Sequence, residues 1–179
     1  MKPLHTLPPF MHNGVLHAVI EISAGTSMKQ AYDPVSGTIV PMLHDGKPRR
    51  IEFLPYPGNY GFVPGTRMDP DQGGDGHPLD VLVLSDYVPP GSLLAVIPVA
   101  VLKLLDGGLR DDKIIAVPFD PALRILPVHD LPDLRDRYPR VLALVEEWFT
   151  HYDAAQPAQA LGWEDKAAAL AAVAQWTVR

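Results

Sequence analysis

A glycine-rich stretch in the middle of the chain carries the densest group of side chains able to bind a cation. It runs from Asp69 to Asp80 and includes four aspartates, two of them Asp71 and Asp75. Hard divalent cations bind several carboxylate oxygens, and glycines let the backbone bend so that these oxygens converge. Asp69 and Asp71 read as a solvated turn. Asp80 lies within an apolar run, where an unpaired carboxylate is costly to bury. The stretch therefore indicates a cation site around Asp75 and Asp80.

A calcium-binding EF-hand is a competing interpretation of the same stretch. Counting Asp69 as loop position one puts Asp71 at position three and Asp80 at position twelve. Gly73 would then stand at position five, and the required glutamate is absent. The flanking residues also alternate like strands and lack a helical period, so the EF-hand is disfavoured.

Two other segments carry polar side chains in turns. Lys103 to Lys113 is a charged loop between two apolar runs, which by itself could be an ordinary hairpin. Phe53 to Phe62 places two tyrosines and an asparagine among prolines and glycines. These are either packed turn aromatics or hydrogen-bond donors to a phosphate oxygen.

The elements that must position these residues are short strands followed by helices. Apolar or alternating runs predict strands over residues 14–22, 38–43, 50–54, 79–84, 93–104 and 113–117. Helical spacing after Pro139 predicts a helix ending near Tyr152, and the alanine-rich residues 162–176 predict a second one. Gly/Pro turns between short strands favour a closed, barrel-like sheet. We expect a mainly β fold with C-terminal α-helices, in a single domain over residues 1–179.

Composition excludes several classes of protein. The 179 residues include 15 Lys+Arg and 21 Asp+Glu, a formal charge of −6, which argues against a nucleic-acid or anionic-membrane partner bound through a basic surface. The absence of cysteine excludes disulfides, thiolate metal sites and cysteine nucleophiles. The most apolar run, residues 92–105, is shorter than the ~18 residues of a spanning helix. Residues 4–10 do not form a continuous secretory signal. We expect a soluble, cytoplasmic protein.

Taken together, these segments resemble the metal-dependent family I soluble inorganic pyrophosphatases. The run from Asp75 to Val81, Asp-Gly-His-Pro-Leu-Asp-Val, is close to the family signature Asp-Gly-Asp-Pro-hydrophobic-Asp-hydrophobic. The resemblance extends over about residues 15 to 176. Further similar segments follow in family order: residues 19–22, Lys29, residues 59–61, residues 98–103, Asp106, Asp111, Lys113, residues 151–152 and residues 162–164.

The resemblance implies an OB-like five-stranded β-barrel with the site at its mouth. It implies Mg²⁺-dependent hydrolysis of inorganic pyrophosphate to two phosphates by a metal-activated water, with Mn²⁺ as another usable cation. It also implies a homo-oligomer, commonly a hexamer in bacterial members. The implied metal ligands are Asp75, Asp80, Asp106, Asp111 and, in the outer shell, Glu21. The implied phosphate contacts are Lys29, Tyr60, Lys113, Tyr152 and either Arg49 or Arg50; the implied catalytic groups are His77, Tyr60 and Lys29.

Four positions depart from the family pattern. His77 replaces an aspartate that helps to activate water, and Ala31 replaces a glutamate. Gly107 replaces an acidic residue, and Asp153 replaces a phosphate-contacting lysine, which reverses the charge. A histidine can still accept a proton. Three functions follow as alternatives: the pyrophosphatase, a hydrolase of another phosphoanhydride or phosphate ester, and a catalytically silent metal- or phosphate-binding paralogue.

Overall fold

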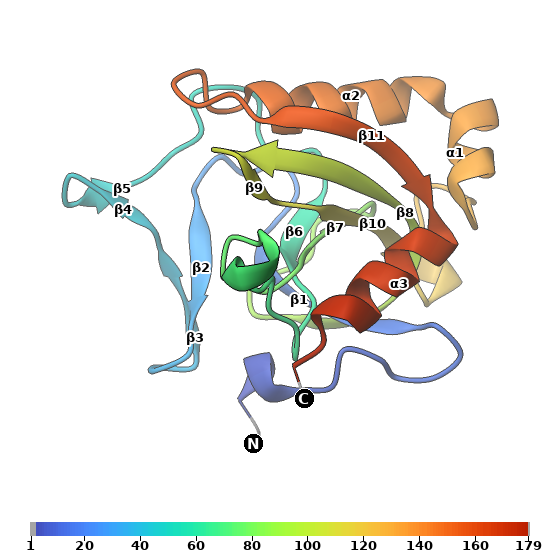
Figure 1. Ribbon diagram of the computed structural model, residues 1–179, viewed down its shortest axis with the longest axis horizontal. Helices are drawn as coiled ribbons and strands as arrows, with labels where there is room; N and C mark the ends of the chain where they lie inside the picture. Colours follow the sequence, from blue (N-terminus) through green and yellow to red (C-terminus); the bar gives the residue numbers. More distant parts are fainter. Residues whose placement is uncertain (1–2, 179) are drawn as a thin grey trace.

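The chain folds around a closed barrel of five strands, seen in a computed structural model that describes residues 3–178 (Figure 1). The sheet runs β1-β6-β7-β10-β8, and β8 pairs with β1 to close the ring. β7 and β10 pair in parallel, and the other ring pairs are antiparallel. The ring confirms the predicted barrel. Its strands are β1 (Leu16–Ile22), β6 (Asn59–Phe62), β7 (Asp80–Val83), β8 (Leu93–Asp106) and β10 (Lys113–Pro118).

The 14-residue strand β8 is the longest element of the barrel. Its sequence is almost continuously apolar, as expected for a strand covered on both faces. Its first residues pair with β1 and its middle with β10. Its far half pairs with β11 (Gln159–Asp165), and its last residues pair with β9 (Leu109–Arg110). β8 therefore connects the barrel to the C-terminal part of the chain.

Two small hairpins project away from the barrel, at the left of Figure 1. One joins β2 (Gln30–Asp33) to β3 (Thr38–Pro41), and the other joins β4 (Leu43–His44) to β5 (Lys47–Pro48). The predicted strand over 38–43 is thus divided between β3 and β4. We call residues 30–50 the hairpin arm.

The predicted strand over 50–54 is wrong. Only Arg50 makes a bridge, to Met28. Phe53 and Leu54 are exposed, and the Leu54 carbonyl accepts a hydrogen bond from the indole of Trp148. The alternating pattern is real in the sequence, but the segment packs beside a helix and has no strand to pair with.

Three α-helices follow the barrel: α1 (Leu131–Arg137), α2 (Pro139–His151) and α3 (Lys166–Trp176). α2 matches the predicted helix, with Pro139 in its first turn. The sequence analysis missed α1, a short helix capped by the Asp130 side chain. The second predicted helix starts too early, because residues up to Asp165 pair with β8. Asp165 then caps α3 by accepting the Ala168 N–H.

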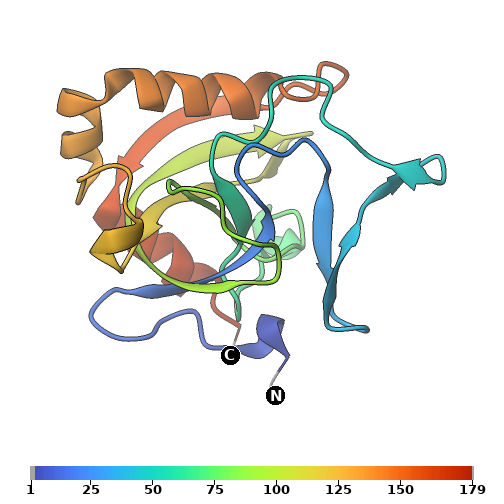
Figure 2. The ribbon, with the colours of Figure 1, turned by 180° about the vertical axis from the view of Figure 1, so that it is seen from behind.

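Helices lie on two sides of the barrel (Figure 2). Each side has its own apolar core between the strands and the helix that covers them. One core includes Val145, Trp148 and Phe149 of α2. The other includes Ala169 and Val173 of α3. Three short 3₁₀ helices lie in the connections: η1 (Leu4–Thr6), η2 (Pro70–Gln72) and η3 (Pro121–Leu123). No helix in the described part of the chain is long and apolar enough to cross a membrane.

Candidate active site

Two carboxylates and an ammonium group meet where β7 and β10 begin. Asp80 and Lys113 are register partners in this parallel pair, so their side chains lie side by side. The Lys113 Nζ lies 2.5 Å from Asp80 Oδ2 and 2.5 Å from Asp111 Oδ1. Tyr60, on the neighbouring strand β6, donates its hydroxyl to Asp80 Oδ2 at 2.5 Å. We call these four residues the central cluster.

The central cluster keeps a charged amine inside the protein. The Lys113 side chain is only 4% exposed, and burial by itself would lower its pKa. The carboxylates of Asp80 and Asp111 outweigh burial and hold the pKa of Lys113 above its ordinary value. Burial and the nearby Asp80 charge raise the pKa of Tyr60 well above its ordinary value, so its phenol stays a donor.

The central cluster suits a divalent cation, although the carboxylates present do not form a complete cage. Asp80 and Asp111 each direct an oxygen at the same ammonium group, so they are arranged to share one positive charge. Carboxylate oxygens are the donors that Mg²⁺ and Mn²⁺ prefer. Within residues 3–178, no three His, Asp or Glu side chains are grouped closely enough to hold a metal ion. Of the implied metal ligands, the structure brings Asp80 and Asp111 together around one ammonium group.

Asp75, another implied metal ligand, bonds within its own loop. Its Oδ1 accepts a hydrogen bond from the backbone N–H of His77 at 2.9 Å, and its Oδ2 lies 3.0 Å from the His77 Nδ1. The imidazole is 77% exposed, so His77 lies at the surface of the loop. Asp69 caps η2 by accepting the Asp71 N–H, which agrees with a turn role for this part of the stretch.

Glu21 and Asp106, the other two implied metal ligands, lie on separate strands. Glu21, near the end of β1, accepts a hydrogen bond from the Tyr32 N–H at 2.7 Å. Burial raises the pKa of Glu21 to about 7, and the Asp80 charge adds to the rise. Asp106, at the end of β8, accepts a hydrogen bond from the Gln156 side chain at 2.7 Å.

The implied phosphate contacts outside the central cluster are Lys29, just before the hairpin arm, Arg49 within the arm, and Tyr152, just after α2. Lys29 donates to the Tyr152 hydroxyl at 3.4 Å. Burial, Arg49 and Lys113 lower the pKa of Lys29 to about 8. The Arg49 guanidinium bonds Asp153 Oδ2 at 2.6 Å. Arg50 instead reaches the Ser27 hydroxyl on an exposed surface, at 3.5 Å. Arg49 is therefore the arginine beside Lys29 and Tyr152.

Two aromatic residues that the sequence analysis did not select form the wall of the site. The Tyr56 ring lies 5.3 Å from that of Tyr60, and burial raises its pKa well above the ordinary value. The Phe149 ring lies 5.6 Å from the Lys113 Nζ. Tyr56 belongs to the Pro/Gly turn that the sequence analysis singled out. Phe149 lies in the last turn of α2, three residues before Tyr152, which directly follows the helix.

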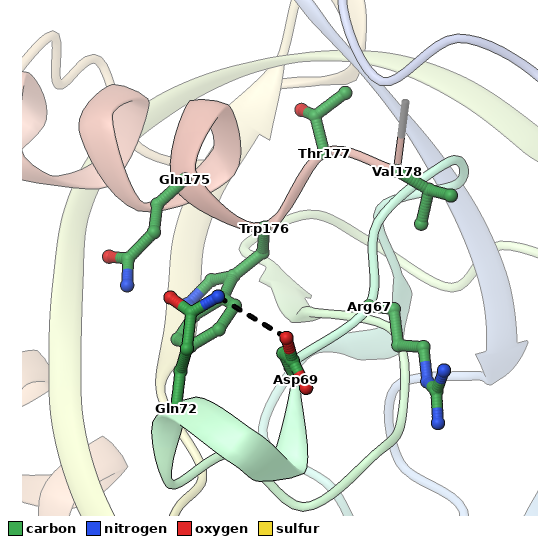
Figure 3. Close-up of a pocket in the computed structure, with 7 residues that line it drawn as sticks. All are labelled: Arg67, Asp69, Gln72, Gln175, Trp176, Thr177 and Val178. Atoms are coloured by element: carbon green, nitrogen blue, oxygen red, sulfur yellow. Dashed lines mark hydrogen bonds between the residues drawn. The ribbon is translucent and has the colours of Figure 1, made fainter.

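The cavity drawn in Figure 3 lies elsewhere. It has a volume of about 220 Å³ and lies between η2 and the end of α3. Its walls include Arg67, Asp69 and Trp176, none of them an implied metal or phosphate contact. Asp69 bonds the Gln72 amide there, so its carboxylate is used within the turn. The candidate site is instead the central cluster, at the polar end of the β6, β7 and β10 strands.

Comparisons with known proteins give one answer. The family described as inorganic pyrophosphatase matches residues 18–179. An inorganic pyrophosphatase from Haloferax volcanii is 36% identical over 165 residues, covering 88% of this chain and 84% of that protein. One from Sulfolobus acidocaldarius is 34% identical over 159 residues, covering 83% and 82%. The crystal structure of the Thermus thermophilus inorganic pyrophosphatase superposes with a TM-score of 0.82 at 32% identity, covering 98% of this chain and 97% of that one. With this match over nearly its whole length, the chain belongs to the inorganic pyrophosphatase family.

Proposed function

We propose that the protein hydrolyses inorganic pyrophosphate to two phosphates, with Mg²⁺ as its cation. The observation that carries the proposal is the central cluster, in a chain whose family match extends over residues 18–179. Pyrophosphate is small and highly anionic, so a site that binds it must supply positive charge more than shape.

Asp80 and Asp111 are the residues that would hold the cation, and Asp75, Asp106 and Glu21 are the further carboxylates proposed for this task. Divalent cations bound there would neutralise substrate charge and lower the pKa of the attacking water. Asp80 and Asp111 share the charge of Lys113 in the structure. A second positive charge beside them would free the amine to face a phosphate oxygen.

The basic and phenolic groups stabilise the charge that develops on the leaving phosphate. Lys113 and Tyr60 act from the barrel end, both held by Asp80. Lys29, Arg49 and Tyr152 act from a second wall of the site, formed by residues outside the barrel strands. Fixed donors aimed at a developing charge are commonly the largest contribution to such catalysis. The reaction needs no covalent nucleophile.

His77 is the proposed proton acceptor for the attacking water. Asp75 bonds the Nδ1 of His77, which fixes the ring orientation and leaves Nε2 as the nitrogen that takes the proton. Asp75 is thus both an implied ligand and the group that positions the imidazole.

Phosphate release from three substrates tests the proposal: pyrophosphate, a nucleoside triphosphate and a simple phosphate monoester, each with Mg²⁺ and with EDTA. We expect Mg²⁺-dependent release that is fastest from pyrophosphate. Preferred release from the triphosphate or the monoester would indicate the altered hydrolase. Phosphate or metal binding without any turnover would indicate the silent paralogue.

We also propose that the protein is a cytoplasmic homo-oligomer built from one domain over residues 1–179. A hexamer is the assembly that the family resemblance favours. Light scattering at working concentration measures the mass directly, and a monomer mass would overturn this proposal.

A further inference from the structure

One implied phosphate contact is already paired with an anion of the chain itself. The Arg49 guanidinium bonds the Asp153 carboxylate at 2.6 Å, across 104 residues of sequence. The Arg49 and Asp153 side chains are 34% and 30% exposed, so the pair is accessible to solvent but not loose on the surface. A charge-assisted bond of this length is among the stronger contacts between side chains.

Hydrogen bonds with backbone groups hold both partners in place. The Arg49 N–H bonds the Met42 carbonyl, and the Arg49 carbonyl accepts the Lys29 N–H, so the arginine is fixed within the hairpin arm. Asp153 follows the last turn of α2. Its Oδ1 accepts the Ala155 N–H at 3.2 Å, which leaves Oδ2 for Arg49. The two carboxylate oxygens thus have separate tasks.

The pair adjoins the other phosphate contacts on this wall. Tyr152 precedes Asp153 and bonds Lys29 through its hydroxyl, and the Lys29 ammonium lies 4.8 Å from the Tyr152 ring centre. Arg49 is close enough to Lys29 to lower its pKa. The wall therefore carries two cationic side chains, and one carboxylate neutralises one of them. An incoming phosphate has to compete with Asp153 for Arg49.

We propose that Asp153 sets the phosphate affinity of the site: it pairs with Arg49 in the free protein and weakens the binding of phosphate groups at this wall. This inference rests on the proposed function, because it takes Arg49 as a phosphate contact. When substrate binds, a phosphate oxygen replaces Asp153 Oδ2 as the partner of the Arg49 guanidinium. When product leaves, the ion pair between Asp153 and Arg49 forms again. The pair thus raises KM and promotes release of phosphate.

Asp153→Asn tests the pair with little disturbance of the fold. The asparagine keeps an oxygen for the Ala155 N–H but loses the charge that binds Arg49. Exposed and half-exposed ion pairs change an affinity by up to about fivefold. We expect Asp153→Asn to bind inorganic phosphate about two- to fivefold more tightly by calorimetry, and to lower KM for pyrophosphate by a similar factor with kcat unchanged or reduced.

Three variants complete the experiment. Asp153→Glu keeps the charge and should bind phosphate like the parent. Asp136→Asn removes one charge from an exposed residue of α1 and should change the phosphate Kd by less than about twofold. In an Arg49→Ala background, adding Asp153→Asn should also leave Kd nearly unchanged, since the competing partner is gone.

Two results would overturn the inference. One is an Asp153→Asn protein that binds phosphate no more tightly than the parent. The other is an equal gain in the Arg49→Ala background, which would assign the effect to net charge alone. Phosphate binding is measured without turnover, so a parent that fails to hydrolyse pyrophosphate would contradict the proposed function and leave this test valid.

Discussion

The carboxylates of Asp80 and Asp111 both bond the Lys113 ammonium group, so a change at either one alters the charge balance of the central cluster. Asp80→Asn or Asp111→Asn keeps the shape but removes a negative charge from the central cluster. We expect each change to lower the rate of pyrophosphate hydrolysis at least 100-fold, the scale seen when one charge-stabilising group is lost. Asp86→Asn, an exposed aspartate shortly after β7, is the control and should keep parent activity. A parent-like rate in Asp80→Asn would remove this carboxylate from the mechanism.

His77 supplies a second prediction, because it replaces an aspartate of the family pattern. If Nε2 accepts the proton, His77→Asn should lower kcat about 10²- to 10⁴-fold, the range for loss of a general base. His77→Asp should recover most of that rate with Mg²⁺. Stopped assays of phosphate release over a range of Mg²⁺ concentrations compare the three proteins. Equal rates in the parent and His77→Asn would make His77 an ordinary surface histidine.

Lys29 gives the site a dependence on pH. Burial first, and then Arg49 and Lys113, lower the pKa of Lys29 to about 8, so its charge is present below pH 8 and is lost as the pH rises above it. The proposed contact of Lys29 with phosphate needs the charged form, so KM for pyrophosphate should rise between about pH 7.5 and 9.5 in the parent. Lys29→Arg keeps its charge over this range and should flatten the rise. Identical KM profiles for parent and variant would show that Lys29 does not set the dependence.

At the scale of elements, the seam between β1 and β6 depends on a glycine. A Cβ on Gly61 would lie 1.8 Å from the Val19 carbonyl oxygen, so the two strands could not keep their spacing. We expect Gly61→Ala to lower the free energy of unfolding by about 2 kcal/mol or more, measured by urea denaturation. Gly46→Ala is the control: it sits at φ 74° with nothing within 4 Å, so only backbone strain of about 1 kcal/mol applies. Equal losses in the two variants would contradict the close approach.

Sequence patterns predicted the elements best where the local signal and the tertiary partner agree. The strands β7, β8 and β10 were predicted correctly, because a nearly continuous run of apolar residues is typical of a strand that is buried on both faces. Residues 50–54 carry a strand pattern but lack a partner strand. Residues 162–165 directly precede an alanine-rich helix and were predicted to belong to it. They instead pair with β8 as part of strand β11. Pairing partners are a property of the whole fold and cannot be read from a short window.

The site shows the same division. The family resemblance selected Asp80, Asp111, Lys113 and Tyr60, and the structure brings all four together. For Asp153, the resemblance indicated only that a negative charge replaces the lysine of the family pattern. The bond to Arg49 joins positions 104 residues apart, and no local pattern reports such a contact.

On the scale of the whole molecule, cation binding should stabilise the fold. A ligand that binds only the native state adds about 2.7 kcal/mol at one hundred times its Kd. We expect Mg²⁺ to raise the melting temperature, by several degrees at saturation, and EDTA to reverse the rise. Asp80→Asn should respond much less. An unchanged melting temperature of the parent in millimolar Mg²⁺ would contradict a cation site in the native protein.

The parallel register of β7 with β10 has a consequence for refolding. Asp80 and Lys113 are neighbours only because two strands, 33 positions apart along the chain, have come into line, with all of β8 between them in sequence. Pairings between residues far apart in sequence form slowly, because closing the loop costs conformational entropy before the new contacts stabilise the chain. A refolding protein can regain its helix signal early, while its enzymatic rate has to wait until this strand pair is in place. Recovery of turnover after dilution from denaturant therefore cannot precede the alignment of β7 and β10.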